Sequence, residues 1–454
     1  MTARLARLNL GIVFKALISG MVLLGVWALF INISWFDEPL HPELVSMREL
    51  RSVSMEGNAY VLALGFAAAQ ERSPQLVGRK ILEVLRVKHE RGQSIALTAQ
   101  ESEAILGGSK LDEDWQEELK SLTCNARRYL NCAEQLIAEM ARADVTTPRL
   151  SALFERYSLL LEQPRFEESQ ERDVFSPMPP YQALTAIGRL RLAKSYERES
   201  IPEFLSKAGQ DFKFWLRALR EGETLATKMV SLAGIQNDLD FLSTLMRHRE
   251  LTESDHRQIQ AFLRPLTREE SNIAEALISE ARIALLSGEP PILMRASWLM
   301  KLMSQENATS NEDYMVNVVP MLHRASLSAE EYYRQKAYEP LMYQLRLFPA
   351  PLYNLGGRLA LSEGRDAAQF PARVHDQNGR ILLVLLQSEI ERRPASTEVS
   401  QVINASEYRD PYTGKPMTYD VKAQTIGFKC VHTIFHPPDP PDVCAFPIGP
   451  IEKP

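Results

Sequence analysis

The chain has 454 residues, a formal net charge of −6 and a hydrophobic content of 45%. That hydrophobic content is enough for folded cores, and the length predicts more than one domain. The sequence has no block of lysine and arginine, which argues against a nucleic-acid partner.

The first predicted element is an uncharged run from Ala16 to Phe36. As a helix at about 1.5 Å per residue, it would be about 30 Å long, which is the thickness of a bilayer's hydrocarbon core. The run is longer than the apolar region of a signal peptide, and no small-x-small cleavage site follows it. We therefore expect an uncleaved transmembrane helix over residues 16–36, with a cleaved signal peptide and a buried core helix as alternatives.

The charges on either side of this run predict its orientation. Arg4, Arg7 and Lys15 precede the run, and the first acidic residue is Asp37. By the positive-inside rule, residues 1–15 form a cytoplasmic tail and everything after the anchor lies across the membrane. In a Gram-negative cell the chain would be a single-pass inner-membrane protein with its bulk in the periplasm.

Helix signals recur through residues 37–348, which we expect to form a helical ectodomain. Ser73 and Thr147 each precede a proline, an arrangement typical of a helix start. Thr252 and Ser328 each precede an acidic residue by three positions, which indicates a capping box. No fixed repeat period is present, so irregular helical hairpins are favoured over a repeat array.

The most regular apolar pattern predicts one long helix from Ser206 to His248. Its apolar residues recur about every 3.5 positions and form a seam that another helix must cover. This interaction seam consists of Leu225, Met229, Leu232, Ile235, Leu239, Leu242 and Met246. We expect an antiparallel neighbour within the chain to cover it, with a coiled-coil contact to another chain as the alternative.

Residues 349–454 have a different character and predict a small C-terminal α+β region. The apolar run 381–390 fits either a buried helix or a buried strand. Turn residues around 410–416, followed by alternating apolar positions, predict a β-hairpin. The final 19 residues contain seven prolines, so we expect an extended tail. The fold class is therefore mainly α, with one N-terminal transmembrane helix and this small α+β region.

Four cysteines are present: Cys124, Cys132, Cys430 and Cys444. In an oxidising compartment disulfides are expected, and of the three possible connectivities the two local pairs are the simplest. Residues eight apart on one helix are separated by about 12 Å, too far for a disulfide. Pairing of Cys124 with Cys132 therefore requires a helix break, and we expect a new helix from Cys132 to about Arg142.

Cys430, His432, His436 and Cys444 could instead bind zinc, because thiolates and imidazoles are its usual ligands. Their spacing matches no standard zinc finger, and the expected compartment favours the disulfide. We therefore expect no cofactor.

Two further groups suggest chemistry but fit an ordinary surface better. Asp238 and Asp240 are similar to the acidic metal-binding pair of glycosyltransferases that have the same single-pass membrane topology. However, both residues lie within a regular predicted helix. His248 and His256, with Asp255, could serve in acid–base chemistry but lie at a charged helix boundary. We expect a solvated helix face for the first group and a surface loop for the second.

Residues 181–196 carry Arg189, Arg191 and Lys194, a basic helical face that could contact acidic lipid or glycan. We expect this face to be solvated as well. No His-Glu-x-x-His motif, Gly-x-Ser-x-Gly motif or phosphate-binding loop is present, so no catalytic residue is assigned.

Residues 410–420 read DPYTGKPMTYD. This element resembles a turn near the C-termini of several exported bacterial proteins and, more loosely, the Asp-Pro turn of major pseudopilins of type II secretion. The whole chain resembles uncharacterised single-pass inner-membrane proteins of proteobacteria. It differs from pseudopilins in its length and in lacking their cleavage pattern. The resemblance implies a location in the bacterial envelope.

The sequence thus predicts a membrane-anchored periplasmic scaffold that binds another envelope protein, without evident catalysis. One alternative is an anchored periplasmic enzyme with an unfamiliar helical site. Another is an accessory factor of a secretion or pilus system.

Overall fold

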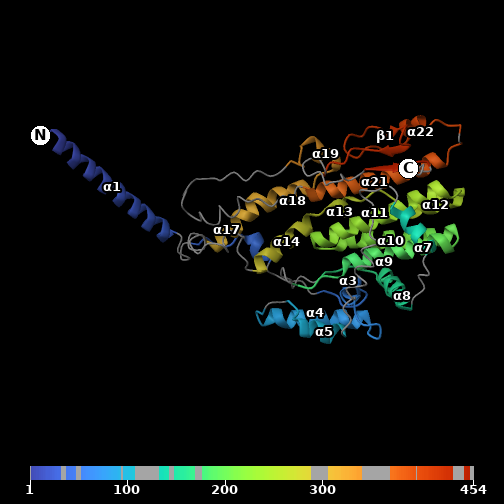
Figure 1. Cartoon of the computed structure of the whole chain (residues 1–454), viewed down its shortest axis with the longest axis horizontal. Helices are drawn as coiled ribbons and strands as arrows, with labels where there is room; N and C mark the ends of the chain where they lie inside the picture. Colours follow the sequence, from blue (N-terminus) through green and yellow to red (C-terminus); the bar gives the residue numbers. More distant parts are fainter. Residues whose placement is uncertain are drawn as a thin grey trace. The chain divides into compact units, whose positions relative to one another are not determined.

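The structure is a computed structural model of the whole chain (Figure 1). It describes residues 2–31, 37–47, 53–93, 96–107, 132–142, 148–168, 176–287, 305–339, 369–394, 396–432 and 444–449. These residues are mainly helical, with a small three-stranded antiparallel sheet near the C-terminal end. The mainly α fold with a small C-terminal β element is therefore confirmed.

The chain divides into two compact units. Unit 1 comprises Met1–Glu49, Ala284–Pro320 and Leu341–Asp366. Unit 2 comprises Leu50–Ile283, Met321–Pro340 and Ala367–Pro454. Unit 2 thus combines helices from the predicted ectodomain with residues 367–454 of the C-terminal region, which was expected to begin at residue 349.

In unit 1, the described elements are α1 (Thr2–Ile31), α2 (Pro42–Ser46), α17 (Glu306–Asp313) and the π-helical turn η2 (Tyr314–Val318). Helix α18 (Val319–Ala325) follows η2 and continues from unit 1 into unit 2 after Pro320. The predicted transmembrane run overlaps α1 as far as Ile31, and residues 32–36 lie outside the described residues. Within the part of the chain that the structure describes, no helix is both long enough and apolar enough to cross a membrane.

Most helices of unit 2 precede residue 290. They are α3 (Ala59–Leu64), α4 (Pro74–Glu90), α5 (Ala99–Leu106), α7 (Cys132–Arg142), α8 (Pro148–Glu162), α9 (Tyr181–Arg198), α10 (Ile201–Glu221), α11 (Leu225–His248), α12 (Glu253–Phe262), α13 (Arg268–Ser271) and α14 (Ala274–Ser287). The last of these, α14, continues into unit 1 after Ile283. The later ones are α19 (Ala329–Arg334), α21 (Gln369–Glu391) and α22 (Val399–Ala405).

Helix α11 lies at the centre of unit 2, in contact with α7, α9, α10, α21 and strand β3 (Figure 1). Its seam residues from Leu232 to Met246 are buried, whereas Leu225 and Met229 are half-buried. Helices of the same chain therefore cover the seam.

The prediction of one helix from Ser206 to His248 is wrong, because α10 ends at Glu221 and α11 begins at Leu225. Gly222 takes up an extended conformation, and a Cβ atom there would lie 2.6 Å from the carbonyl oxygen of Ala218. Thr224 then caps α11, because its side chain accepts a hydrogen bond from the N–H of Thr227.

Several predicted helix starts are confirmed. Helices α4 and α8 begin at Pro74 and Pro148, and α7 runs from Cys132 to Arg142 as expected. Thr252 and Ser328 each form a complete capping box with the acidic residue three positions later.

The C-terminal region combines a helix with the small sheet. The ambiguous run 381–390 is helical and lies within α21. Strands β1 (Thr418–Asp420) and β2 (Thr425–Gly427) form the predicted hairpin, with Tyr419 opposite Ile426. Strand β3 (Ala445–Pro447), which was not predicted, pairs antiparallel with β2 and places Phe446 opposite Ile426.

Candidate functional site

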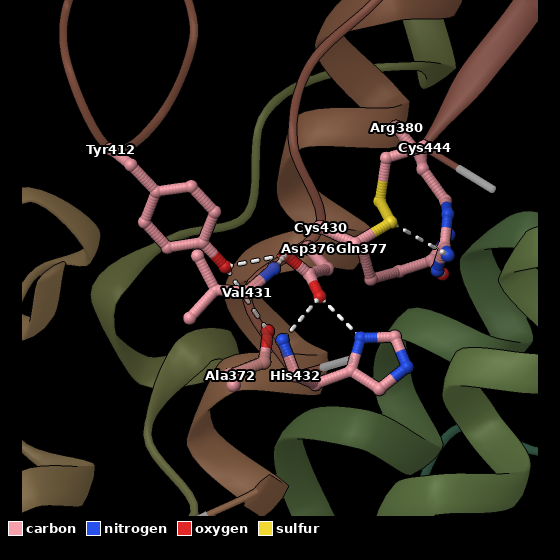
Figure 2. Close-up of a disulfide and its surroundings, with 9 residues drawn as sticks. All are labelled: Ala372, Asp376, Gln377, Arg380, Tyr412, Cys430, Val431, His432 and Cys444. Carbon is pink, nitrogen blue, oxygen red and sulfur yellow. Dashed lines mark hydrogen bonds and ion pairs between the residues drawn. A yellow bond between two sulfur atoms is a disulfide. The ribbon is translucent and has the colours of Figure 1, made fainter. Parts of the chain in front are cut away.

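The buried carboxylate of Asp376 on α21 connects two segments of the C-terminal region (Figure 2). It accepts a hydrogen bond from the hydroxyl of Tyr412 at 2.6 Å and from the backbone N–H of Val431 at 3.0 Å. It also accepts two from His432, one from the backbone N–H at 3.2 Å and one from ring Nδ1. We call this cluster the Asp376 centre.

The turn at residues 410–416 brings Tyr412 to this carboxylate. The Asp410 side chain accepts a hydrogen bond from the N–H of Tyr412 at 2.8 Å, and its carbonyl accepts one from Gly414 at 2.9 Å. Gly414 has a φ of +65°, a conformation that side chains with a Cβ rarely adopt. The DPYTGKP element is thus a turn that carries its tyrosine into the core.

A disulfide joins Cys430 to Cys444 beside this centre, with their Cα atoms 5.5 Å apart (Figure 2). The bond connects the chain after β2 to the residue before β3, so the predicted local pairing of Cys430 with Cys444 is confirmed. The buried guanidinium of Arg380 lies next to it, with Nη2 3.9 Å from the Cys430 sulfur. Cys132 is also disulfide-bonded, and Cys124 lies outside the described residues.

The disulfide corrects the alternative of a zinc site at Cys430, His432, His436 and Cys444. Both sulfurs are bonded to each other, so neither is available as a thiolate ligand. The Asp376 carboxylate lies within 4.8 Å of the two sulfurs, but its oxygens already accept four hydrogen bonds. His436 lies outside the described residues.

Two neighbouring groups on α21 have shifted pKa values. Burial alone would raise the pKa of Asp376, but the hydrogen bond and positive charge of His432, together with Arg380, hold that pKa below its usual value. Burial lowers the pKa of His375 to about 4, against the opposing charge of Asp376. The centre therefore favours an ionised Asp376 beside a neutral His375.

A second polar cluster lies between the helices around α11. These buried residues, which we call together the buried ion network, form two groups: Tyr157, Arg191, Asp211 and Asp238 make up the first, and Arg189 and Asp240 make up the second. The hydroxyl of Tyr157 donates a hydrogen bond to Asp211 at 2.8 Å. Arg191 lies 3.9 Å from the other carboxylate oxygen of Asp211, and the charges of Asp211 and Arg191 both act on Asp238.

Asp240 connects the network to α7. Its carboxylate accepts a hydrogen bond from the N–H of Ala133 at 2.7 Å, in the first turn of that helix. An acidic group is favourable there because the N-terminal N–H groups of a helix lack partners within the helix. The guanidinium of Arg189 supplies a nearby opposite charge.

The network corrects two predictions. Asp238 and Asp240 are not on a solvated helix face, and Arg189 and Arg191 are not on a solvated basic face, because all four are buried. The acidic positions of α11 and the basic positions of α9 lie on helices that pack against each other. Lys194 is only half-buried, with its ammonium 5.3 Å from the centre of the Phe154 ring.

Burial shifts the pKa values of all three aspartates upward. Burial raises the pKa of Asp211, against the charge of Arg191, and it raises that of Asp238 further because Asp211 lies nearby. Burial raises the pKa of Asp240 to about 7, although Arg189 and the N–H of Ala133 oppose this shift.

The expected surface loop around residues 248–256 is only partly correct. His248 is exposed, and its Nε2 lies 2.8 Å from a carboxylate oxygen of Glu134. Asp255 and His256 are buried in the first turn of α12, where Asp255 completes the capping box. Ring Nδ1 of His256 lies 2.9 Å from the hydroxyl oxygen of Ser388 on α21. His256 is therefore a packing residue between α12 and α21.

Both clusters hold together segments that are far apart in the sequence. The Asp376 centre connects α21 to residues 412 and 431–432, and the ion network connects α7 to α11.

Comparisons with protein-family models, with curated proteins and with solved structures find no match in any of the three.

Proposed function

We propose that the protein is a membrane-anchored scaffold of the bacterial envelope, held in the inner membrane by its N-terminal helix and carrying its folded bulk in the periplasm. The observation that carries this proposal is the exposed apolar surface of α1. A helix that packs on a soluble core has one apolar stripe, whereas α1 exposes large apolar side chains at consecutive positions. They are Phe14, Leu17, Ile18, Met21, Val22, Leu23, Leu24, Val26, Trp27, Leu29 and Phe30.

Lipid is the partner that such a surface requires. Side chains all around a helix can be covered at once by acyl chains, and the apolar run in the sequence matches the thickness of the hydrocarbon core. The flanking charges then favour a cytoplasmic N-terminus. The disulfide between Cys430 and Cys444 is in keeping with the oxidising compartment on the other side of the membrane.

The scaffold part of the proposal is supported by the two buried polar clusters of unit 2. Their donors and acceptors stabilise contacts between distant helices, and a fixed helical body is suited to presenting a constant surface to another protein. We propose an envelope protein as that partner.

In-cell crosslinking followed by purification of the full-length protein tests the scaffold role. We expect one envelope protein to be recovered reproducibly in near-equal amount. The Asp376→Asn variant adds a second test, because it should weaken the fold of unit 2 and therefore reduce the amount of partner recovered. A protein that is crosslinked to nothing and purifies as a monomer would contradict the scaffold role.

A further inference from the structure

The segment that follows the predicted anchor is fastened to α17 within unit 1. The carboxylate of Asp37 accepts hydrogen bonds from the N–H groups of Asn307 at 2.8 Å and Ala308 at 3.0 Å. These groups belong to the first turn of α17, so Asp37 stabilises the start of that helix.

Asn311, one turn further along α17, holds the same segment at three points. Its side-chain N–H group donates to a carboxylate oxygen of Glu38 at 2.8 Å and to the carbonyl of Pro39 at 2.9 Å. Its side-chain oxygen accepts a hydrogen bond from the N–H of His41 at 2.7 Å. The ring of His41 then lies 5.2 Å from the ring of Tyr314, the first residue of η2.

These contacts limit the distance of α17 and η2 from the end of α1. Asp37 follows Ile31, the last residue of α1, by six positions. Six residues span at most about 20 Å even when fully extended. If α1 is in the bilayer, the start of α17 lies close to the membrane surface.

Apolar side chains are exposed in this same part of unit 1. Met315 in η2 is 53% exposed, and Val319, four positions later, is 37% exposed. Val45 on α2, just beyond the fastened segment, is 50% exposed. The π-helical turn that carries Met315 is a rare element that often occurs where a helix has a function.

We propose that Val45, Met315 and Val319 form a membrane-contact surface that enters the boundary between the headgroups and acyl chains of the bilayer beside the anchor. Apolar side chains on short amphipathic segments bind there when they are held near the membrane. Glu38, Glu43 and Glu306 are exposed in the same segments, so zwitterionic headgroups suit this surface better than anionic ones. This inference rests on the anchor of the proposed function.

Site-directed nitroxide labelling tests the contact in the full-length protein, reconstituted in phosphatidylcholine nanodiscs. Single variants Val45→Cys, Met315→Cys and Val319→Cys are labelled and exposed to oxygen, which concentrates in lipid, and to a water-soluble nickel chelate. Val421→Cys is the matched water control, because Val421 is 66% exposed and lies in unit 2. Val22→Cys in α1 is the lipid control.

We expect the ratio of oxygen to nickel collisions to be several-fold higher at residues 45, 315 and 319 than at residue 421. Equal ratios at these positions and at residue 421, with the Val22→Cys label in lipid, would overturn the contact and leave the anchor intact. A Val22→Cys label that reports water would overturn the anchor and the contact together.

Discussion

Asp376 binds His432 through both the backbone N–H and the ring Nδ1, although the two residues are 56 positions apart in the sequence. The carboxylate therefore fixes the main chain and the side chain of the same residue. Cys430, two residues before His432, is joined by a disulfide to Cys444, the residue that precedes β3. The contact between Asp376 and His432 therefore helps to hold β3 against α21.

Asp376→Asn should destabilise unit 2 by about 2–4 kcal/mol, because the amide offers one acceptor oxygen where the buried carboxylate offers two. Denaturant unfolding monitored by circular dichroism measures the change. Glu407→Gln is the control, since Glu407 is exposed in the same region and its replacement should change stability by less than about 0.5 kcal/mol. Equal stability of the two variants would contradict the role of Asp376.

The disulfide variant Cys430→Ser/Cys444→Ser should lose about 3 kcal/mol of stability. The bond closes a loop with a sequence separation of 14, and a loop of this size restricts the unfolded chain by about that amount. Comparing the variant with the unaltered protein, both without reductant, leaves the bond at Cys132 intact. An unchanged unfolding midpoint would show that the contacts of Asp376 alone hold the tail.

Asp240 should make stability depend on pH. Its folded pKa of about 7 exceeds the usual value of 3.8, so the folded state holds the proton more tightly than the unfolded state. Its contribution is fully present below about pH 4 and is lost as pH rises to about 7. Relative to Asp240→Asn, the free energy of unfolding of the unaltered protein should therefore fall by on the order of 3 kcal/mol over this pH range.

Paired unfolding curves of the two proteins at pH 4, 5, 6 and 7 measure this difference. Taking the difference between the two proteins removes the pH-dependent contributions to stability that they share. One of these comes from His375, because its lowered pKa makes the folded state less stable as the pH falls. A difference that does not vary with pH would mean that Asp240 stays ionised in the folded state, paired with Arg189.

Gly379 allows the sheet region to approach α21. A Cβ atom at this position would overlap the ring of Phe428. Gly379→Ala should therefore destabilise the protein by about 1–3 kcal/mol, even though alanine favours helices. Adding Phe428→Leu should recover part of the loss, and a double-mutant cycle measures the coupling. Additive effects would contradict direct packing between these two residues.

Local signals were sufficient to predict much of the helical fold. Capping at Thr252 and Ser328 and the prolines at 74 and 148 depend only on neighbours in the sequence, and each begins a helix as expected. Strand β3 could not be predicted in the same way. It has three residues including Pro447, and it forms because β2 and the disulfide hold it in place.

The polar clusters were misread because a sequence does not show which helix faces meet. Asp238 and Arg191 have the spacing of ordinary surface charges, and they are buried only because α9 packs against α11. No motif in the sequence marks Asp376 as a buried carboxylate. The available signal was the polar stretch 375–378, which lies two residues before the apolar residues 381–386 in one helix.

The most direct test of the anchored topology uses the exposed position of Val421. A Val421→Cys variant is treated with a membrane-impermeant maleimide in cells whose outer membrane alone has been permeabilised, and the membranes are then washed with alkaline carbonate. We predict that residue 421 is labelled before lysis and that the protein stays in the membrane pellet. Labelling only after lysis, or release of the protein by the wash, would contradict the proposal.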